Sequence, residues 1–218
     1  MGAQSKMGYI TSALAWVLQY ISEAVGSYGL GIIIVTFLLR LVLYPLTVSQ
    51  AKSMAKLKKI QPELEEIQKK YKDKPEEYQK RTVELYQKHG VNPLGGCLPL
   101  LLQLPILWAF FPILRELPTS DITKFMGIWE LSQVAKDPLY ILPILSGVTT
   151  WLQSKVTSTG DSSQSAMLVV MPIMIGFMSA QFPAGLVLYW ITSNLFSIGQ
   201  QLWINKKVLS AEQGGNAK

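Results

Sequence analysis

The chain contains very few of the residues from which enzymatic and metal sites are usually built. Its 218 residues include one cysteine, Cys97, and one histidine, His89. A single cysteine excludes an internal disulfide, and no Cys/His cluster has the spacing of a metal site. Glycine-rich phosphate loops and the motifs of zinc proteases and serine hydrolases are also missing. We therefore expect a protein that is not an enzyme and that uses no metal or other cofactor.

Acidic side chains are missing from every long apolar run of the chain. A membrane span needs about 20 apolar residues to cross a hydrocarbon core of ~30 Å. Five runs have roughly that length and composition: residues 29–48, 94–115, 138–154, 166–182 and 184–204. None of them contains Asp, Glu or His, which argues against a proton-coupled transporter and against an intramembrane protease. The pattern predicts an all-α membrane protein with five transmembrane helices.

The basic residues are concentrated in one part of the chain. Eleven of the 20 lysines and arginines lie between Lys52 and Lys88. When residues 49–93, 155–165 and 205–218 are placed inside, the inner segments carry 15 basic residues and the outer segments four. Loops rich in lysine and arginine stay on the cytoplasmic side of a membrane. The sequence therefore predicts a multi-pass protein with its N-terminus outside and its C-terminus in the cytoplasm.

The segment before the first run is also partly apolar. Its apolar residues, among them Ile10, Leu14 and Ile21, form one helical stripe, and polar residues such as Gln19 and Glu23 lie opposite. A helix with one polar face is typical of the membrane interface. A sixth span is the alternative, but a span rarely keeps so polar a face. We expect an interfacial helix on the outer surface.

The segment 49–91 has an amphipathic helical pattern interrupted by a turn. Asp73 is expected to cap a second helix and Pro75 to lie in its first turn. The result is an antiparallel helical hairpin in the cytoplasm with lysine-rich outer faces. These faces are compatible with simple solvation, with attraction to anionic lipid, or with docking of a partner. The predicted parts are an interfacial helix at 1–27, a membrane core at 28–48 and 94–204, the hairpin at 49–91 and a short cytoplasmic tail at 205–218.

Arg40 lies near the middle of the first apolar run, where a charge is unfavourable. An arginine at membrane depth costs about 2.5–3.5 kcal/mol on insertion scales and usually marks a functional site. Because the five runs contain no carboxylate, water or a ligand must solvate it. Arg40 lies eight residues before Val48, about 12 Å along a helix. The cavity around it should therefore open toward the cytoplasm, and Pro45 should bend the helix on that side.

Neutral polar side chains near the middle of other runs are expected to line the same cavity. Each of them alone is explained by interhelical hydrogen bonding, worth ~0.6 kcal/mol on average. The unpaired charge of Arg40 favours a hydrated groove formed by the whole set. Its predicted members are Thr36, Gln103, Ser193 and Asn194. Methionines along the fourth run suit either ordinary packing or contact with varied apolar substrates; these are Met171, Met174 and Met178.

Three stretches carry a resemblance to a known family: TFLLRLVLYPLTVSQAKSMAKLKKIQPELEEIQKKYKDK, NPLGGCLPLLLQLPILWAFF and FPAGLVLYWITSNLFSIGQQ. They resemble the YidC insertases of the YidC/Oxa/Alb superfamily, and the lack of a large outer domain is similar to the short type of Gram-positive bacteria. The resemblance implies a five-span core with an arginine-bearing groove, open to the cytoplasm and to lipid, and a hairpin that receives substrates. By position, Arg40 and Gln103 would line the groove, and Trp190 with Ser193 would lie on the wall of the fifth span.

The resemblance also implies a function and partners. A YidC-like protein of the bacterial cytoplasmic membrane would insert membrane proteins and help them fold without ATP, either independently of the Sec translocon or together with it. Its partners would be nascent membrane proteins, the Sec translocon, membrane lipids, the ribosome and the signal recognition particle pathway, with no direct recognition of nucleic acid. After Trp203 the tail has only three basic residues, too few for strong ribosome binding.

Two other hypotheses explain the same features. A small anion channel or carrier would use Arg40 as its anion site. A purely structural partner of the Sec translocon would need no groove activity of its own. Conductance of the purified protein in bilayers would favour a channel or carrier over an insertase. Insertion into liposomes without Sec components would exclude a purely structural role.

Overall fold

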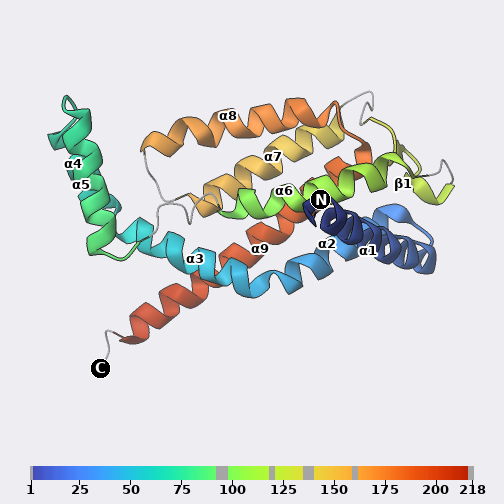
Figure 1. Ribbon diagram of the computed structural model, residues 1–218, viewed down its shortest axis with the longest axis horizontal. Helices are drawn as coiled ribbons and strands as arrows, with labels where there is room; N and C mark the ends of the chain where they lie inside the picture. The colour runs from blue at the N-terminus through green and yellow to red at the C-terminus, as the bar shows by residue number, and fades with distance from the viewer. Residues whose placement is uncertain (1, 92–97, 118–120, 135–139, 159–161, 216–218) are drawn as a thin grey trace.

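The computed structural model describes residues 2–91, 98–117, 121–134, 140–158 and 162–215, and its side chains are described in 8–91, 103–117, 121–134, 140–158 and 168–206. The described residues are mainly helical, as the sequence predicts (Figure 1). The helices are α1 Gly2–Val25, α2 Tyr28–Val42, α3 Tyr44–Lys59, α4 Gln61–Lys70, α5 Pro75–Lys88, α6 Leu98–Arg115, α7 Ile141–Thr157, α8 Ser162–Ser179 and α9 Ala184–Gly215.

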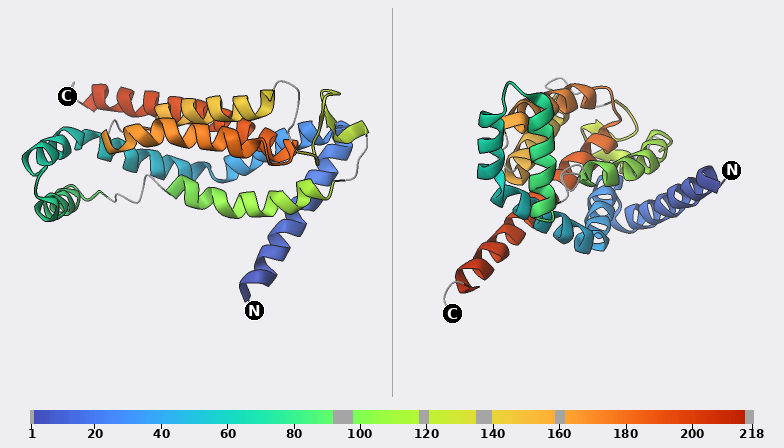
Figure 2. Two further views of the ribbon diagram at one scale, coloured as in Figure 1. Left: turned by 90° about the horizontal axis from the view of Figure 1, so that it is seen from above. Right: turned by 60° about the vertical axis from the view of Figure 1, so that its left-hand side comes forward.

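Helices α6, α7, α8 and α9 run along the long axis of the molecule, and α2 packs against α9 (Figures 1 and 2). With α2, they correspond to the five apolar runs of the sequence. In the described part of the chain, no helix by itself is both long and apolar enough to cross a membrane, whereas α2 and α3 together meet that criterion across a 63° bend. The five-span topology and its orientation stay predictions.

The first apolar run is a bent helix pair. Helix α2 ends at Val42, and α3 begins at Tyr44 with Pro45 in its first turn. Proline lacks the backbone N–H that would continue the ladder of hydrogen bonds, and its ring crowds the preceding turn. The bend expected near Pro45 is thus confirmed. Helix α3 continues to Lys59, so it crosses the domain boundary predicted between residues 48 and 49.

Helix α1 packs across α2 and α6, and its N-terminal end projects away from the bundle (Figure 2). Gly31 of α2 permits the close approach of α1, because a Cβ atom there would overlap the side chain of Ser22. Gly29 of α2 instead contacts the segment after α6, where a Cβ atom would overlap the ring of Phe125. Leu18 of α1 is fully buried in the main apolar core, while Trp16 points outward. The exposed side of α1 thus includes apolar side chains, and the interfacial position of this helix stays a prediction.

The segment between α6 and α7 contains a short 3-10 helix, Asp121–Thr123, and a two-stranded antiparallel sheet of β1 Lys124–Phe125 and β2 Trp129–Glu130. The all-α prediction did not include this sheet. The residues after β2 hold the start of α9: the Leu131 carbonyl accepts from Gly185 N–H at 2.9 Å, and the Gln133 carbonyl accepts from Ala184 N–H at 2.7 Å. These bonds satisfy N–H groups that a helix start leaves unpaired.

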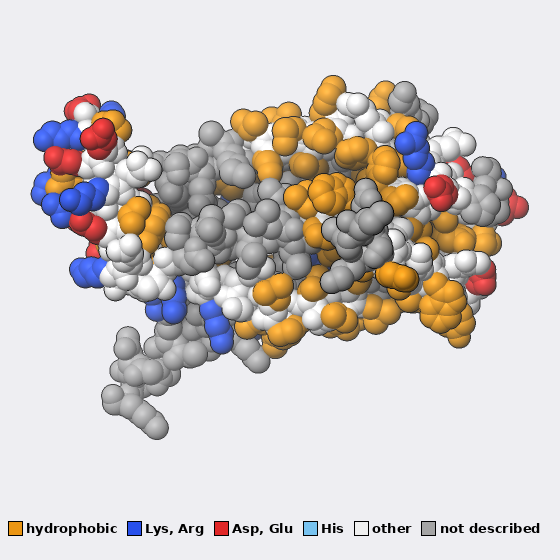
Figure 3. Space-filling model, in the orientation of Figure 1, with side chains coloured by type: hydrophobic (Ala, Val, Ile, Leu, Met, Phe, Trp, Pro, Cys, Tyr) orange, Lys and Arg blue, Asp and Glu red, His pale blue; other side chains and the backbone are white. Residues whose placement is uncertain are grey.

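The hairpin of α4 and α5 projects from one end of the bundle (Figure 1). Four apolar residues form its small core: Ile60, Leu64, Leu85 and Val91. Pro75 occupies the first turn of α5 as predicted, but the residue at the cap position is Lys74, so the expected capping by Asp73 is wrong. Charged side chains cover the hairpin, whereas apolar side chains dominate the visible bundle surface (Figure 3).

Candidate functional site: a polar seam inside the helical bundle

Arg40 reaches from α2 to α9 inside the bundle. It lies in the last turn of α2 and is half-buried, and its guanidinium Nη2 donates a hydrogen bond to Ser193 Oγ. Among the described side chains, none of the ion pairs includes Arg40. Its contact in this structure is therefore a hydroxyl dipole, which cannot neutralise the positive charge.

Ser193 belongs to a chain of polar side chains that links three helices. Tyr189 lies one turn before Ser193 on α9, so the two buried side chains are neighbours on one face of the helix. The Tyr189 hydroxyl accepts a hydrogen bond of 2.6 Å from Gln103 Nε2 on α6. The Tyr189 ring is 2% exposed and stacks on Phe110 at 4.6 Å between centroids. This packing holds the hydroxyl where it joins α6 to α9, one turn from the serine that contacts Arg40 on α2.

The same face of α9 stays polar beyond Ser193. Ser197 and Gln200 follow at helical spacing, so they lie on the face that carries Tyr189 and Ser193. Both are buried, and so is Gln50 on α3. Within the described part of the chain, the amide of Gln200 and the Nε2 of Gln50 have no hydrogen-bond partner. Buried amides are normally paired, so this end of the polar face is suited to water or to a polar ligand.

A second polar group lies on the other side of α9, against α7. Trp190 Nε1 donates to Thr150 Oγ1 at 3.0 Å. The Asn194 amide lies 3.2 Å from Thr149 Oγ1 and 2.9 Å from Thr150 Oγ1. The threonine hydroxyls also donate to carbonyls of their own helix, such as that of Ser146 at 2.7 Å. This group holds α7 and α9 together through paired hydroxyls and an amide.

The six predicted groove residues are thus divided among three environments. Arg40, Gln103 and Ser193 belong to one linked chain, which we call the Arg40 network together with Tyr189. Trp190 and Asn194 belong to the group between α7 and α9. Thr36 is 1% exposed and donates to the Ile32 carbonyl of its own helix at 2.6 Å, so its hydroxyl is already paired.

Sequence reasoning missed Tyr189 and the α7 threonines. The signal for Tyr189 was its place four residues before Ser193, on the same helical face. Thr149 and Thr150 lie beside each other in the middle of the third apolar run, where polar residues are unusual. Their partners were not visible, because hydrogen bonds between helices depend on how the helices are rotated.

The three predicted methionine contacts lie on α8. Met174 and Met178 are exposed, and Met171 is half-buried. Their spacing places all three on one side of the helix. They take no part in the Arg40 network in the described structure, and their role as substrate contacts stays a prediction.

Fold and site together define a predominantly helical protein in which an arginine and a seam of hydroxyl and amide groups meet inside an apolar bundle. Among the described residues, no group of His, Cys, Asp and Glu has the arrangement of a metal site. The family described as "60Kd inner membrane protein" matches residues 20–211. The chain belongs to this family, the YidC membrane protein insertases of the bacterial inner membrane, which confirms the resemblance seen in the sequence.

Relatives of different length match the chain. It is 45% identical over 197 residues to the membrane protein insertase YidC of Fusobacterium nucleatum, covering 89% of this chain and 94% of the relative. It is 42% identical to that of Caldanaerobacter subterraneus, covering 89% and 93%. The YidC of Geobacter sp. strain M21 is 40% identical, but the match covers 92% of this chain and only 38% of that relative.

A solved structure supports the fold. The crystal structure of an active YidC insertase with its first transmembrane domain resolved superposes with a TM-score of 0.70 at 29% identity. The match covers 88% of this chain and 45% of that chain. The chain therefore spans less than half of the solved protein, and the shared part includes most of the helices described above.

Proposed function

We propose that this protein inserts membrane proteins into the bacterial cytoplasmic membrane and helps them fold, without ATP, either alone or together with the Sec translocon. The observation that carries the proposal is the position of Arg40. Its guanidinium lies inside an apolar bundle, contacts the hydroxyl of Ser193, and has no acidic partner among the described side chains. An acidic group that arrives with a substrate would complete this site.

The chemistry of the guanidinium suits a transient carboxylate. A guanidinium has five N–H donors in a rigid fork, so Arg40 can hold Ser193 and a substrate carboxylate at the same time. Charge-assisted hydrogen bonds of this kind replace part of the hydration that a carboxylate loses when it leaves water. The barrier to moving a short acidic tail partway across the membrane is thereby lowered. Partition of the following apolar segment into lipid then drives insertion to completion.

The buried polar face of α9 extends the site beyond Arg40. Ser197 and Gln200 continue the line of buried polar groups on α9, and Gln50 is buried on α3, which also contacts α9. The two α9 residues follow Ser193 toward the C-terminal end of that helix, and α3 is the helix that leads into the hairpin. With the N-terminus outside and the C-terminus inside, this end faces the cytoplasm, so the polar face forms the entry side of the groove.

The hairpin of α4 and α5 would receive substrates before they reach the groove. Its surface carries both signs of charge (Figure 3). Arg81 lies 3.0 Å from Glu84, whose negative charge raises the pKa of Arg81. A charged arm on a small core of four apolar residues suits weak, reversible contacts with nascent chains and with the ribosome or signal recognition particle pathway.

Photo-crosslinking tests the proposal. A photoreactive residue at position 103 or 190 should form an adduct with a ribosome-stalled nascent chain that carries one membrane segment. The same residue at position 9, where Tyr9 is exposed on α1, serves as the control and should form little adduct. Equal adducts from all three positions, or no insertion by the purified protein in liposomes lacking Sec components, would contradict an autonomous insertase.

A further inference from the structure

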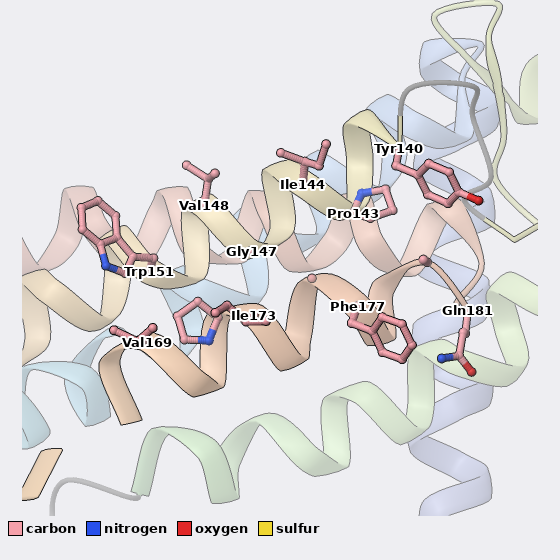
Figure 4. Close-up of a pocket in the computed structure, with 13 residues that line it drawn as sticks. Tyr140, Pro143, Ile144, Gly147, Val148, Trp151, Val169, Ile173, Phe177 and Gln181 are labelled. Atoms are coloured by element: carbon pink, nitrogen blue, oxygen red, sulfur yellow. The ribbon is translucent and has the colours of Figure 1, made fainter. Parts of the chain in front are cut away.

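An apolar groove lies between α7 and α8, apart from the Arg40 network (Figure 4). Its volume is about 780 Å³, within the range of ~300–1,000 Å³ that is typical of small-molecule sites. The helices touch at two glycines, where a Cβ atom at Gly147 would lie 3.2 Å from the Pro172 carbonyl and 3.6 Å from Gly176 Cα. Because neither glycine has a side chain, a trough remains between the flanking residues.

The walls of the groove are exposed apolar side chains from both helices: Ile144, Val148 and Trp151 of α7, and Val169, Ile173 and Phe177 of α8. A contiguous exposed apolar surface of this kind marks a binding site or contact with lipid. The spacing of Met171, Met174 and Met178 places them on the opposite side of α8. The groove is therefore separate from the methionine face considered as a substrate contact.

The two ends of the groove differ in chemistry. Tyr140 and Gln181 lie at one end, and Trp151 and Val169 lie at the other (Figure 4). One turn after Trp151, the exposed Lys155 places its Nζ 5.0 Å from the centre of the Trp151 ring. This cation–π contact holds the ammonium beside Trp151 at that end of the groove. Tryptophan and lysine at the end of an apolar helix are typical of the level of lipid headgroups.

We propose that this groove binds an anionic phospholipid, with one acyl chain along α7 and α8 and its phosphate paired with Lys155. The ligand must combine a long apolar part with an anion at one end, because the walls are apolar and the cation lies at the Trp151 end. A phospholipid has both features in one molecule. A membrane segment of another protein would match the walls but would leave the position of Lys155 unexplained. The lipid also explains why the trough need not be filled by side chains.

Native mass spectrometry of the full chain in mild detergent tests the site, with phosphatidylglycerol or phosphatidylcholine added. Phosphatidylglycerol should be retained in preference to phosphatidylcholine. Lys155→Gln should lower this retention about fivefold, as expected for the loss of one basic residue near an anionic headgroup. Val148→Trp and Ile173→Trp should each abolish it by filling the groove.

The matched controls are Lys124→Gln and Val170→Trp, since Lys124 is an exposed cation that pairs with Asp121 outside the groove lining and Val170 is exposed on α8 outside that lining. Both controls should retain the lipid, and all variants should melt at the temperature of the parent protein. Equal retention of the two lipids by every variant would overturn the proposal. So would a photoreactive residue at position 173 that captures a nascent chain or a second copy in place of lipid.

Discussion

Arg40 and Ser193 lie 153 positions apart in the chain, and a hydrogen bond from the guanidinium to the hydroxyl joins them across α2 and α9. Tyr189, the neighbour of this serine one turn earlier on α9, accepts a hydrogen bond from Gln103 on α6. Three helices that are remote in the sequence thus share one polar connection inside an apolar bundle. Hydroxyl dipoles in this connection solvate the positive charge without neutralising it, as the proposed attraction of a substrate carboxylate requires.

Replacing Arg40 by Ala should slow the insertion of substrates with acidic tails by about tenfold to a hundredfold, because a hydrogen bond to a charged group contributes about 1.5–3 kcal/mol. Arg40→Lys should keep more activity than Arg40→Ala or Arg40→Glu. Protection of the substrate from protease in proteoliposomes measures the rate. Arg115→Ala, which removes an exposed cation at the end of α6, should have little effect. Wild-type insertion of acidic tails by Arg40→Ala would exclude the mechanism.

Replacing Tyr189 by Phe should destabilise the protein by about 1–3 kcal/mol, because the partly buried amide of Gln103 then loses its hydrogen-bond partner. Thermal unfolding in detergent measures the change, with Tyr9→Phe as a control at an exposed position. Adding Gln103→Met to Tyr189→Phe should recover part of the loss, since no polar group is then left unpaired. If the double variant loses the sum of both single effects, the hydrogen bond between these side chains is not important for stability.

Trp190 and Thr150 should be energetically coupled, since their side chains share a 3.0 Å hydrogen bond between α9 and α7. In a double-mutant cycle, Trp190→Phe and Thr150→Val should show a coupling free energy near the ~0.6 kcal/mol that is average for such pairs in membranes. Trp190→Phe and Gln103→Met should instead be additive, because they belong to different polar groups. Strong coupling in the second cycle would mean that the two groups act as one.

Introducing a methyl group at Gly31 should loosen α1 from α2. The new Cβ atom would overlap the side chain of Ser22, and overpacking of this kind costs about 1–3 kcal/mol. The melting temperature of Gly31→Ala should fall, and protease should cleave α1 more readily. Gly8→Ala is the matched control, because nothing lies within 4 Å of a Cβ atom at that position. An unchanged melting temperature for Gly31→Ala would show that α1 packs less closely than described.

Local patterns in the sequence were sufficient to predict the positions of most helices. Long apolar runs bounded by charge and turn residues identified the helical segments, and Pro45 identified the bend between α2 and α3. The short sheet of β1 and β2 was missed because two residues per strand carry no detectable alternation. The predicted cap of α5 was Asp73, one residue before the observed Lys74, because a proline in the first turn fits either of the first two helical positions.

The sequence by itself determined the composition of the polar site: one arginine near the middle of an apolar run, no carboxylate in any of the runs, and a few neutral polar residues at similar depth. It also carried the motifs of the family. Only the tertiary structure decided which of these residues meet. The rotation of α9 directs Tyr189 and Ser193 toward α6 and α2, and it directs Trp190 and Asn194 toward α7. That rotation results from packing among helices distant in sequence, including the stacking of Tyr189 on Phe110, and no local pattern encodes it.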